Sequence, residues 1–161
     1  MSGNTMFAGF EDHAAIGKRL RRLSHQIDQD AARLYQANGF QFEQRWFGVL
    51  NQLVVKGSMS VKDLSAALGI THASVSETRK SLQAAGYIQS SRDKNDARSR
   101  LLSLTNAGLK FIDRIAPIWL ALESASIEIN KEADNVVLAL DRLDEALTKM
   151  SLFDRASSKL G

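Results

Sequence analysis

The first pattern in the sequence is a run of apolar residues at helical spacing near the beginning of the chain. The steps between them are three or four residues, as on one face of a long amphipathic helix. Asn38 and Gly39 follow, and both residue types tolerate the left-handed conformation that closes a helix. The apolar face consists of Ile16, Leu20, Leu23, Ile27, Ala31 and Leu34.

Residues 42–69 predict two further helices, each ended by a glycine. The first covers residues 42–56 and stops at Gly57 and Ser58. The second begins at Ser60, which has Asp63 three residues on, as in a capping box, and Gly69 breaks it. The side chains expected to face inward from the first of these helices are Trp46, Phe47, Leu50, Leu53 and Val54.

Another helix is predicted directly after the turn at Gly69, with Thr71 as its N-cap and an end near Ala85. Val75, Thr78 and Leu82 lie on its inward face. This segment therefore reads as a helix, a tight turn and a second helix.

Residues 87–92 and 100–104 are short β-compatible runs, separated by the polar stretch DKNDARS. This arrangement predicts a β-hairpin with a long charged tip. Leu102 and Leu104 are expected to anchor it to the core.

After Thr105 the helical period returns in two runs, both close to heptad spacing. Pro117, the only proline, interrupts the first run, so we expect either a kinked helix or two helices that meet there. The chain ends are expected to fray. The first run consists of Ile112, Ile115, Trp119, Leu122, Ser126 and Ile129, and the second of Val136, Leu140, Leu143, Leu147 and Met150.

These elements predict a mainly α chain with a small β-hairpin wing, that is, a winged helix-turn-helix plus a helical dimerisation region. In such a fold the second helix of the pair enters the DNA major groove, and the wing reaches the backbone or the minor groove. We expect an N-terminal dimerisation helix (1–40), a winged helix-turn-helix (41–108) and C-terminal dimerisation helices (109–161), in one compact domain overall, as 161 residues allow.

Charge is concentrated in the predicted DNA-binding segment. Between Gly57 and Gly108 there are seven basic and four acidic residues, so this segment carries the whole formal net charge of +3. The pattern favours a polyanionic partner, although a solvated basic surface is the alternative.

Composition excludes several classes of protein. The absence of cysteine excludes a disulfide framework and a thiolate nucleophile, and it fits the cytoplasm. No signal peptide and no apolar stretch of roughly 18 residues occurs, so we expect no membrane association. No Gly-rich phosphate loop, GxSxG or HExxH motif is present, so we expect no enzyme and no cofactor. His13 and His25 belong to a different predicted helix from His72, at a spacing that puts them on different faces, so we expect no metal site either.

The run RDKNDARSRLLSLTNAGLKF resembles the wing of the multiple-antibiotic-resistance regulator (MarR) family. Members of that family carry Asp-x-x-Asp-x-Arg, then a hydrophobic strand, then Leu-Thr-x-x-Gly at the start of a long helix. The matching residues here are Asp93, Asp96, Arg98, Leu104, Thr105 and Gly108.

The resemblance implies a DNA-binding regulator with Arg98 in the minor groove and Asp96 orienting it; an ordinary solvated ion pair is the alternative. Lys94 and Arg100 contact phosphate or are simply solvated. Glu77 departs from the basic or amide residue expected in the groove, unless it accepts a hydrogen bond from a cytosine amino group. Arg79 stands where an aliphatic residue is more usual. The residues expected to contact DNA are Thr71, His72, Ser74, Ser76, Glu77, Arg79, Lys80, Lys94, Asp96, Arg98 and Arg100.

The outer helices offer more apolar face than a small winged helix can cover, which favours a homodimer over a monomeric helical core. The resemblance also implies an effector, a small aromatic anion that weakens DNA binding. Arg45 beside aromatic residues suits a carboxylate, although aromatic residues at helical spacing are also typical of a core. The residues that could line such a site are Tyr35, Phe42, Arg45, Trp46 and Trp119.

We therefore predict a transcription regulator, acting as a repressor, whose homodimer binds a pseudo-palindromic double-stranded DNA operator. Some relatives in this family carry an acetyltransferase domain, but the 53 residues after Gly108 leave no room for one. The alternative is a helical interaction module whose winged helix binds protein, or binds DNA without sequence preference.

Overall fold

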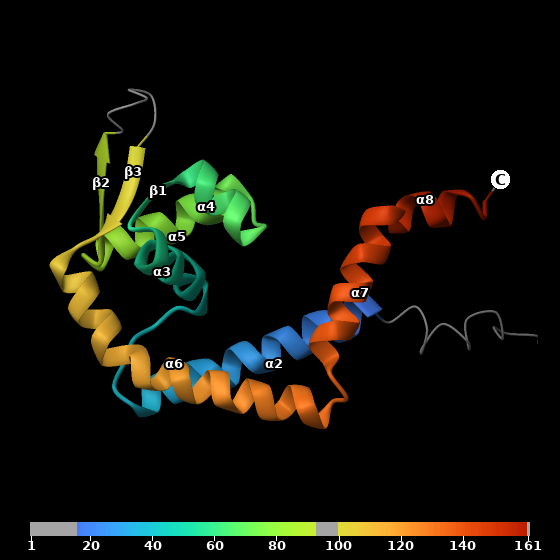
Figure 1. Cartoon of the computed structure of the whole chain (residues 1–161), viewed down its shortest axis with the longest axis horizontal. Helices are drawn as coiled ribbons and strands as arrows, with labels where there is room; N and C mark the ends of the chain where they lie inside the picture. The colour runs from blue at the N-terminus through green and yellow to red at the C-terminus, as the bar shows by residue number, and fades with distance from the viewer. Residues whose placement is uncertain (1–15, 93–99, 161) are drawn as a thin grey trace, which may run out of the picture. The chain divides into compact units, whose positions relative to one another are not determined.

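The computed structural model describes residues 16–92 and 100–160. The described chain is mainly helical with one three-stranded antiparallel sheet (Figure 1), which confirms the predicted fold class. It divides into two compact units, Met1–Ala116 and Pro117–Gly161. The wing-tip residues Lys94, Asp96 and Arg98 lie outside the described residues.

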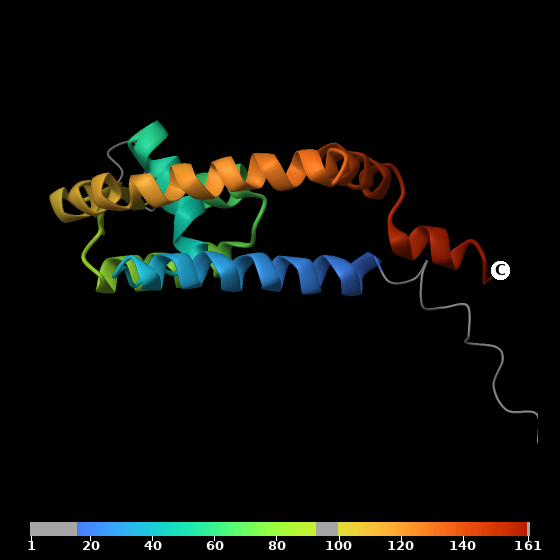
Figure 2. The same ribbon diagram turned by 90° about the horizontal axis from the view of Figure 1, so that it is seen from below.

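The first described element is α2 (Ile16–Ala37), an uninterrupted helix in Figure 2. It ends where the sequence predicted, because Gly39 adopts the left-handed conformation with φ of +77°. Ala31 and Tyr35, near its C-terminal end, are buried. The apolar residues of its first turns are exposed; they are Ile16, Leu20, Leu23 and Ile27.

The helix-turn-helix follows the predicted order: α3 (Gln44–Lys56), α4 (Val61–Leu68) and α5 (His72–Ala84). The Ser60 hydroxyl accepts a hydrogen bond from the Asp63 amide at 3.1 Å, which confirms the predicted cap of α4. Gly69 then ends α4 in the left-handed conformation, with φ of +64°. In the turn that follows, the Ser65 hydroxyl donates a hydrogen bond of 2.5 Å to the Ile70 carbonyl. Side-chain hydrogen bonds therefore define both ends of α4.

The inward face of α3 differs in part from the prediction. Trp46, Leu50 and Leu53 are buried as expected, but Phe47 and Val54 are 38% and 50% exposed. Both positions lie roughly 80–100° around the helix from Trp46, beyond the arc that α4 and α5 cover. Val49, on the other side of that arc, is buried instead.

The sheet consists of β1 (Ser58–Ser60), β2 (Ile88–Arg92) and β3 (Arg100–Leu104), with β3 in the centre. The hairpin of β2 and β3 confirms the predicted wing, with Leu102 fully buried and Leu104 half-buried. The edge strand β1 was not predicted. It pairs with β3 from Ser58 opposite Ser103 to Ser60 opposite Leu101.

An aromatic cluster joins α2, α3, the start of the hairpin and α6 in the first unit. Tyr87 and Phe111 stack with their ring centroids 4.1 Å apart, and Trp46 meets the Tyr87 ring edge-on at 5.9 Å. Contacts of this geometry stabilise beyond the area that they bury. The cluster consists of Tyr35, Phe40, Phe42, Trp46, Tyr87 and Phe111.

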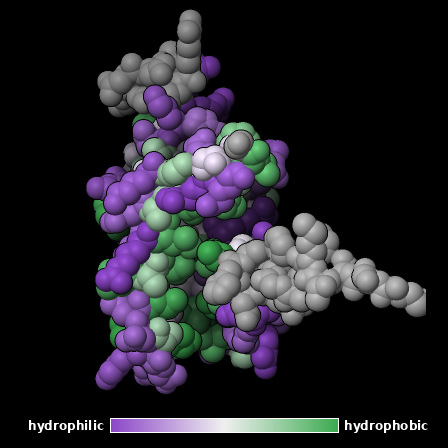
Figure 3. Space-filling view, turned by 90° about the vertical axis from the view of Figure 1, so that its right-hand side faces the viewer, coloured by the Kyte–Doolittle hydropathy of each residue, from purple (hydrophilic) through white to green (hydrophobic). Residues whose placement is uncertain are grey.

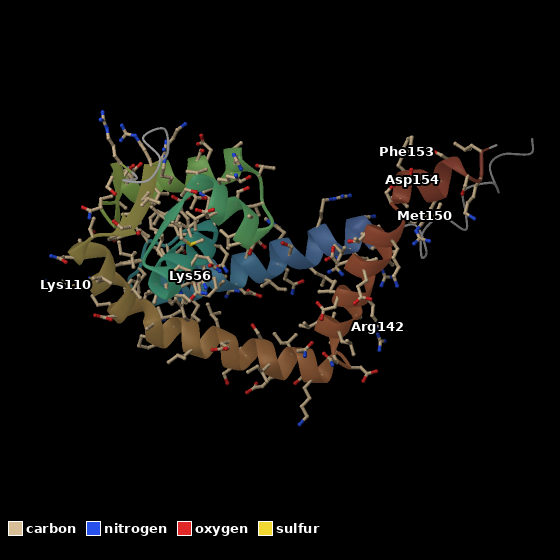
Figure 4. All side chains as sticks on the ribbon, turned by 45° about the horizontal axis from the view of Figure 1, so that its top comes forward. Lys56, Lys110, Arg142, Met150, Phe153 and Asp154 are labelled. Atoms are coloured by element: carbon tan, nitrogen blue, oxygen red, sulfur yellow. The ribbon has the colours of Figure 1, made fainter. Side chains whose placement is uncertain are left out.

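The C-terminal part contains α6 (Asn106–Glu132), α7 (Val136–Lys149) and α8 (Leu152–Ser157). Since α6 continues through Pro117 as one helix, the alternative of two helices meeting there is wrong. The short α8 was not predicted; Figure 4 labels Met150 where α7 ends, and Phe153 and Asp154 on α8. None of the helices in residues 16–92 and 100–160 is long and apolar enough to cross a membrane.

Candidate nucleic-acid interface

The helix α5 presents one packed side and one open side. Val75, Thr78 and Leu82 are buried to 2% exposure or less, as the sequence predicted. The open side extends from the N-cap into the third turn and holds short or polar side chains. Its exposed residues, named here the α5 face, are Thr71, His72, Ala73, Ser74, Glu77 and Lys80.

Two of the predicted DNA contacts form the N-cap of α5. The Thr71 hydroxyl accepts a hydrogen bond from the Ser74 amide at 3.1 Å and lies 2.9 Å from the Ser74 hydroxyl. Both side chains are exposed. The pair therefore starts the helix and also stands at the surface where a groove would be read.

Glu77 carries the only negative charge on the α5 face, and cations surround it. The Lys80 ammonium donates a hydrogen bond of 2.8 Å to its carboxylate, with both side chains more than half exposed. This hydrogen bond and the charge of Lys80 lower the pKa of Glu77, and the charge of Arg45 lowers it further. Glu77 is therefore ionised near neutral pH in the free protein.

Ser76 and Arg79 lie at the border between the two sides of α5, and both are half-buried. The Nε of Arg79 is buried, and no other described residue forms a hydrogen bond with it. Ser76 is less available for contact than the prediction assumed.

The hairpin brings two arginines together at its open end. Arg92, the last residue of β2, is directly opposite Arg100, the first residue of β3, and both are exposed. Like charges at directly opposite positions repel each other, and an anion between them relieves the repulsion. Arg92 was not among the predicted contacts, because its position opposite Arg100 follows from the strand register.

A hollow of about 660 Å³ lies between α5 and the start of α3. Arg45 and Gly48 of α3 line one wall, and Ser74 and Glu77 of α5 line another. The Arg45 guanidinium also pairs with Glu43, with its Nε 2.6 Å from the carboxylate oxygen. The hollow thus opens beside the α5 face and holds charges of both signs.

The residues predicted to line an effector site lie in different surroundings. Tyr35, Phe42 and Trp46 pack on one another in the aromatic cluster, with ring centroids 4.4 and 5.7 Å apart. The Trp46 indole also donates a hydrogen bond of 2.7 Å to the Ser81 hydroxyl. Arg45 lines the hollow beside α5, and Trp119 belongs to the second unit. The structure therefore brings three of the five together as core, without Arg45 among them.

In residues 16–92 and 100–160 no three histidine, aspartate or glutamate side chains gather to hold a metal ion.

A sequence model described as the MarR family matches residues 39–99, which include α3, α4, α5 and β2. No curated protein matches the sequence closely enough to count as a relative.

Several solved structures share this fold. One is the S. aureus MepR–DNA complex, at 20% identity and a TM-score of 0.70, covering 82% of this chain and 98% of that one. Another describes regulation of DNA binding of Bordetella bronchiseptica BpsR by 6-hydroxynicotinic acid, at 20% identity and a TM-score of 0.69, covering 89% and 98%. A third is mutant MarR from E. coli complexed with operator DNA, at 21% identity and a TM-score of 0.61, covering 84% and 99%. At these identities the likeness establishes the fold.

Proposed function

We propose that the protein is a DNA-binding transcription regulator of the MarR family, whose sequence model matches residues 39–99, and that it is a repressor that binds a pseudo-palindromic operator as a homodimer. The observation that carries this function is the α5 face, an exposed helix surface of short or polar side chains opposite a buried side. A helix of this kind fits the major groove and reads base edges there.

Phosphate contacts supply the sequence-independent part of the binding. Arg100 was predicted for this role, and Arg92 joins it at the open end of the hairpin. Arg98 is the proposed minor-groove contact, with Asp96 orienting it and Lys94 nearby in sequence. Arg98→Ala is expected to lower operator affinity markedly with folding intact, and unchanged affinity would refute its assignment.

Exposed apolar side chains support the homodimer. In the first unit they lie on α2, where Ile16, Leu23 and Ile27 are each more than 40% exposed. In the second unit they lie on α7, where four side chains are also more than 40% exposed: Val137, Leu138, Leu140 and Leu147. Figure 3 shows hydrophobic residues, in green, exposed on the face that it presents. A two-fold partner would cover these faces and place two α5 helices roughly 34–36 Å apart on DNA.

A small aromatic anion is the proposed effector. The B. bronchiseptica protein, whose DNA binding is regulated by 6-hydroxynicotinic acid, supports this class of ligand. Arg45 is the proposed partner of the carboxylate, because its guanidinium is half exposed and lines a hollow beside α5. Aromatic acids that shift the operator-binding curve of the wild type, but not of Arg45→Ala, would support the assignment.

The test of the function is DNA binding by the purified protein to the promoter region beside its own coding sequence. The titration is repeated at several salt concentrations and with a random duplex of equal length. Preference for the promoter duplex, with affinity that falls steeply with salt, is the expected result. Equal weak binding to both duplexes would indicate a general DNA binder, and salt-independent or absent binding would indicate a protein-interaction module.

A further inference from the structure

The carboxylate of Glu77 on the α5 face is unfavourable for binding to DNA in general. Non-specific affinity comes almost entirely from neutralised phosphates, so a negative charge at the reading surface opposes it for every sequence. Glu77 lies with Ser74 on the wall of the hollow beside α5, and its side chain is 60% exposed. Packing does not explain a glutamate at this position.

The cations around Glu77 lower the affinity for non-cognate DNA in a second way. The Lys80 ammonium donates a hydrogen bond of 2.8 Å to the Glu77 carboxylate. The positive charge of Arg45, which lines the same hollow, also stabilises the ionised carboxylate. A lysine that already holds an internal counterion releases fewer ions when it meets a phosphate. Non-cognate DNA therefore gains less from Lys80 than the formal charge of the helix suggests.

The cost of placing a carboxylate in the major groove can be offset by a hydrogen bond at one kind of base. The exocyclic amino group of cytosine is a donor at the groove edge, and a carboxylate accepts from it. At adenine the amino group stands beside the N7 acceptor, and guanine offers only acceptors in this groove, so both suit a lone carboxylate less well.

We propose that Glu77 is a specificity-determining residue, which reads a cytosine in each operator half-site and weakens binding to all other DNA. This inference rests on the proposed function, since it requires α5 to lie in the major groove. In this proposal Glu77 discriminates between DNA sequences, whereas Arg92 and Arg100 supply affinity for DNA of any sequence.

The experiment compares the wild type with Glu77→Gln in salt-dependent binding to a random duplex and in selection of binding sites from a random library. Glutamine keeps the size and helix preference of the side chain and removes its charge. We expect the variant to bind the random duplex about tenfold more tightly, and to lose a cytosine preference that the wild type shows at one position of each half-site.

Asp30→Asn on α2 is the matched control. Asp30 also belongs to an exposed i,i+3 ion pair, with Arg33 at 3.2 Å, so its removal changes the net charge equally. We expect this variant to bind like the wild type. If both variants tighten random binding equally, or if Glu77→Gln leaves either its random affinity or its base preference unchanged, the inference is overturned. If the wild type binds no duplex, the proposed function fails, and the inference fails with it.

Discussion

The Thr105 hydroxyl donates a hydrogen bond of 2.6 Å to the carbonyl of Gly86, across 19 residues of sequence. The Thr105 amide also donates to the carbonyl of Tyr87 at 3.0 Å, and the Gly108 amide donates to the Thr105 hydroxyl at 3.0 Å. These bonds connect the turn after α5 to the first turn of α6. The Leu-Thr-x-x-Gly motif thus has a structural explanation, since the threonine forms the joint and the glycine allows the close approach.

Gly108→Ala is expected to destabilise the protein. A Cβ at this position would lie 2.1 Å from the Tyr87 carbonyl oxygen, which is backbone and cannot move aside without displacing the joint. Overpacking of this kind costs about 1–3 kcal/mol, measurable by denaturant unfolding. Gly17→Ala is the control: its Cβ would meet only the end of the Arg21 side chain at 3.4 Å, and no loss of stability is expected there. Equal stability of the two variants would contradict the account of the joint.

Ser81→Ala is expected to destabilise the packing of α3 on α5. The buried Trp46 indole would lose the acceptor that it now reaches at 2.7 Å. Leaving a buried donor without a partner costs about 1–3 kcal/mol of unfolding free energy. Ser126→Ala is the control, because the exposed Ser126 hydroxyl donates to the Leu122 carbonyl within α6. This variant should change the unfolding free energy by only about a few tenths of a kcal/mol. Comparable losses for the two serines would argue against a specific role of the indole bond.

Arg92→Ala and Arg100→Ala are each expected to weaken binding to promoter and random duplexes alike. If each side chain contacts one phosphate, the slope of log affinity against log salt should fall by about 0.9 for each variant. Arg33→Ala on α2 is the control, and its slope should match that of the wild type. A change confined to one duplex sequence would instead indicate base reading by the hairpin.

Lys80→Gln is expected to raise the pKa of Glu77 toward its ordinary value, because Lys80 is the main cause of the lowering. Since the folded pKa is the lower one, the stabilisation from this pair is present above the unfolded pKa and is lost as pH falls through the folded pKa. Both side chains are exposed, so the effect on stability is small and salt weakens it further. Carboxyl NMR titration of wild type and variant measures the shift, and identical titration curves would show that Lys80 does not hold Glu77.

Arg155→Ala is expected to loosen α8 from the end of α7. The Arg155 guanidinium donates to the carbonyl of Met150 at 3.0 Å and to that of Ala146 at 2.8 Å, which also accepts the Met150 amide at 3.2 Å. These bonds connect α8 to the C-terminal turn of α7. Amide hydrogen exchange in α8 should accelerate in the variant. Arg142→Ala, on the surface of α7 in Figure 4, is the control and should leave α8 unchanged. Slow exchange in both variants would mean that α8 is held by other contacts.

Local signals explain why most of the winged helix could be predicted. The caps at Ser60 and Thr71 and the glycine stops depend only on neighbouring residues, and helical periodicity identified the buried face of α5. The strand β1 has three residues with no alternating pattern, and it exists because β3 lies beside it. The sequence alone offered no signal for it.

The effector residues illustrate a second limit. Arg45 and Trp46 are neighbours in sequence, but successive helix residues point about 100° apart. Trp46 consequently enters the aromatic cluster, and Arg45 turns to the hollow beside α5. Arg92 was missed for a related reason, since only the register of β2 on β3 places it opposite Arg100.

Because α5 has a packed side and an open face, different residues are constrained by the fold and by what the helix binds. Substitution at Val75, Thr78 or Leu82 alters the fold, because these side chains are buried. Substitution at His72, Glu77 or Lys80 mainly changes the surface that α5 presents to a partner, because these side chains are exposed. If α5 reads DNA as proposed, a lineage can therefore acquire a new set of target genes through a few surface changes, with the stability of the scaffold inherited intact.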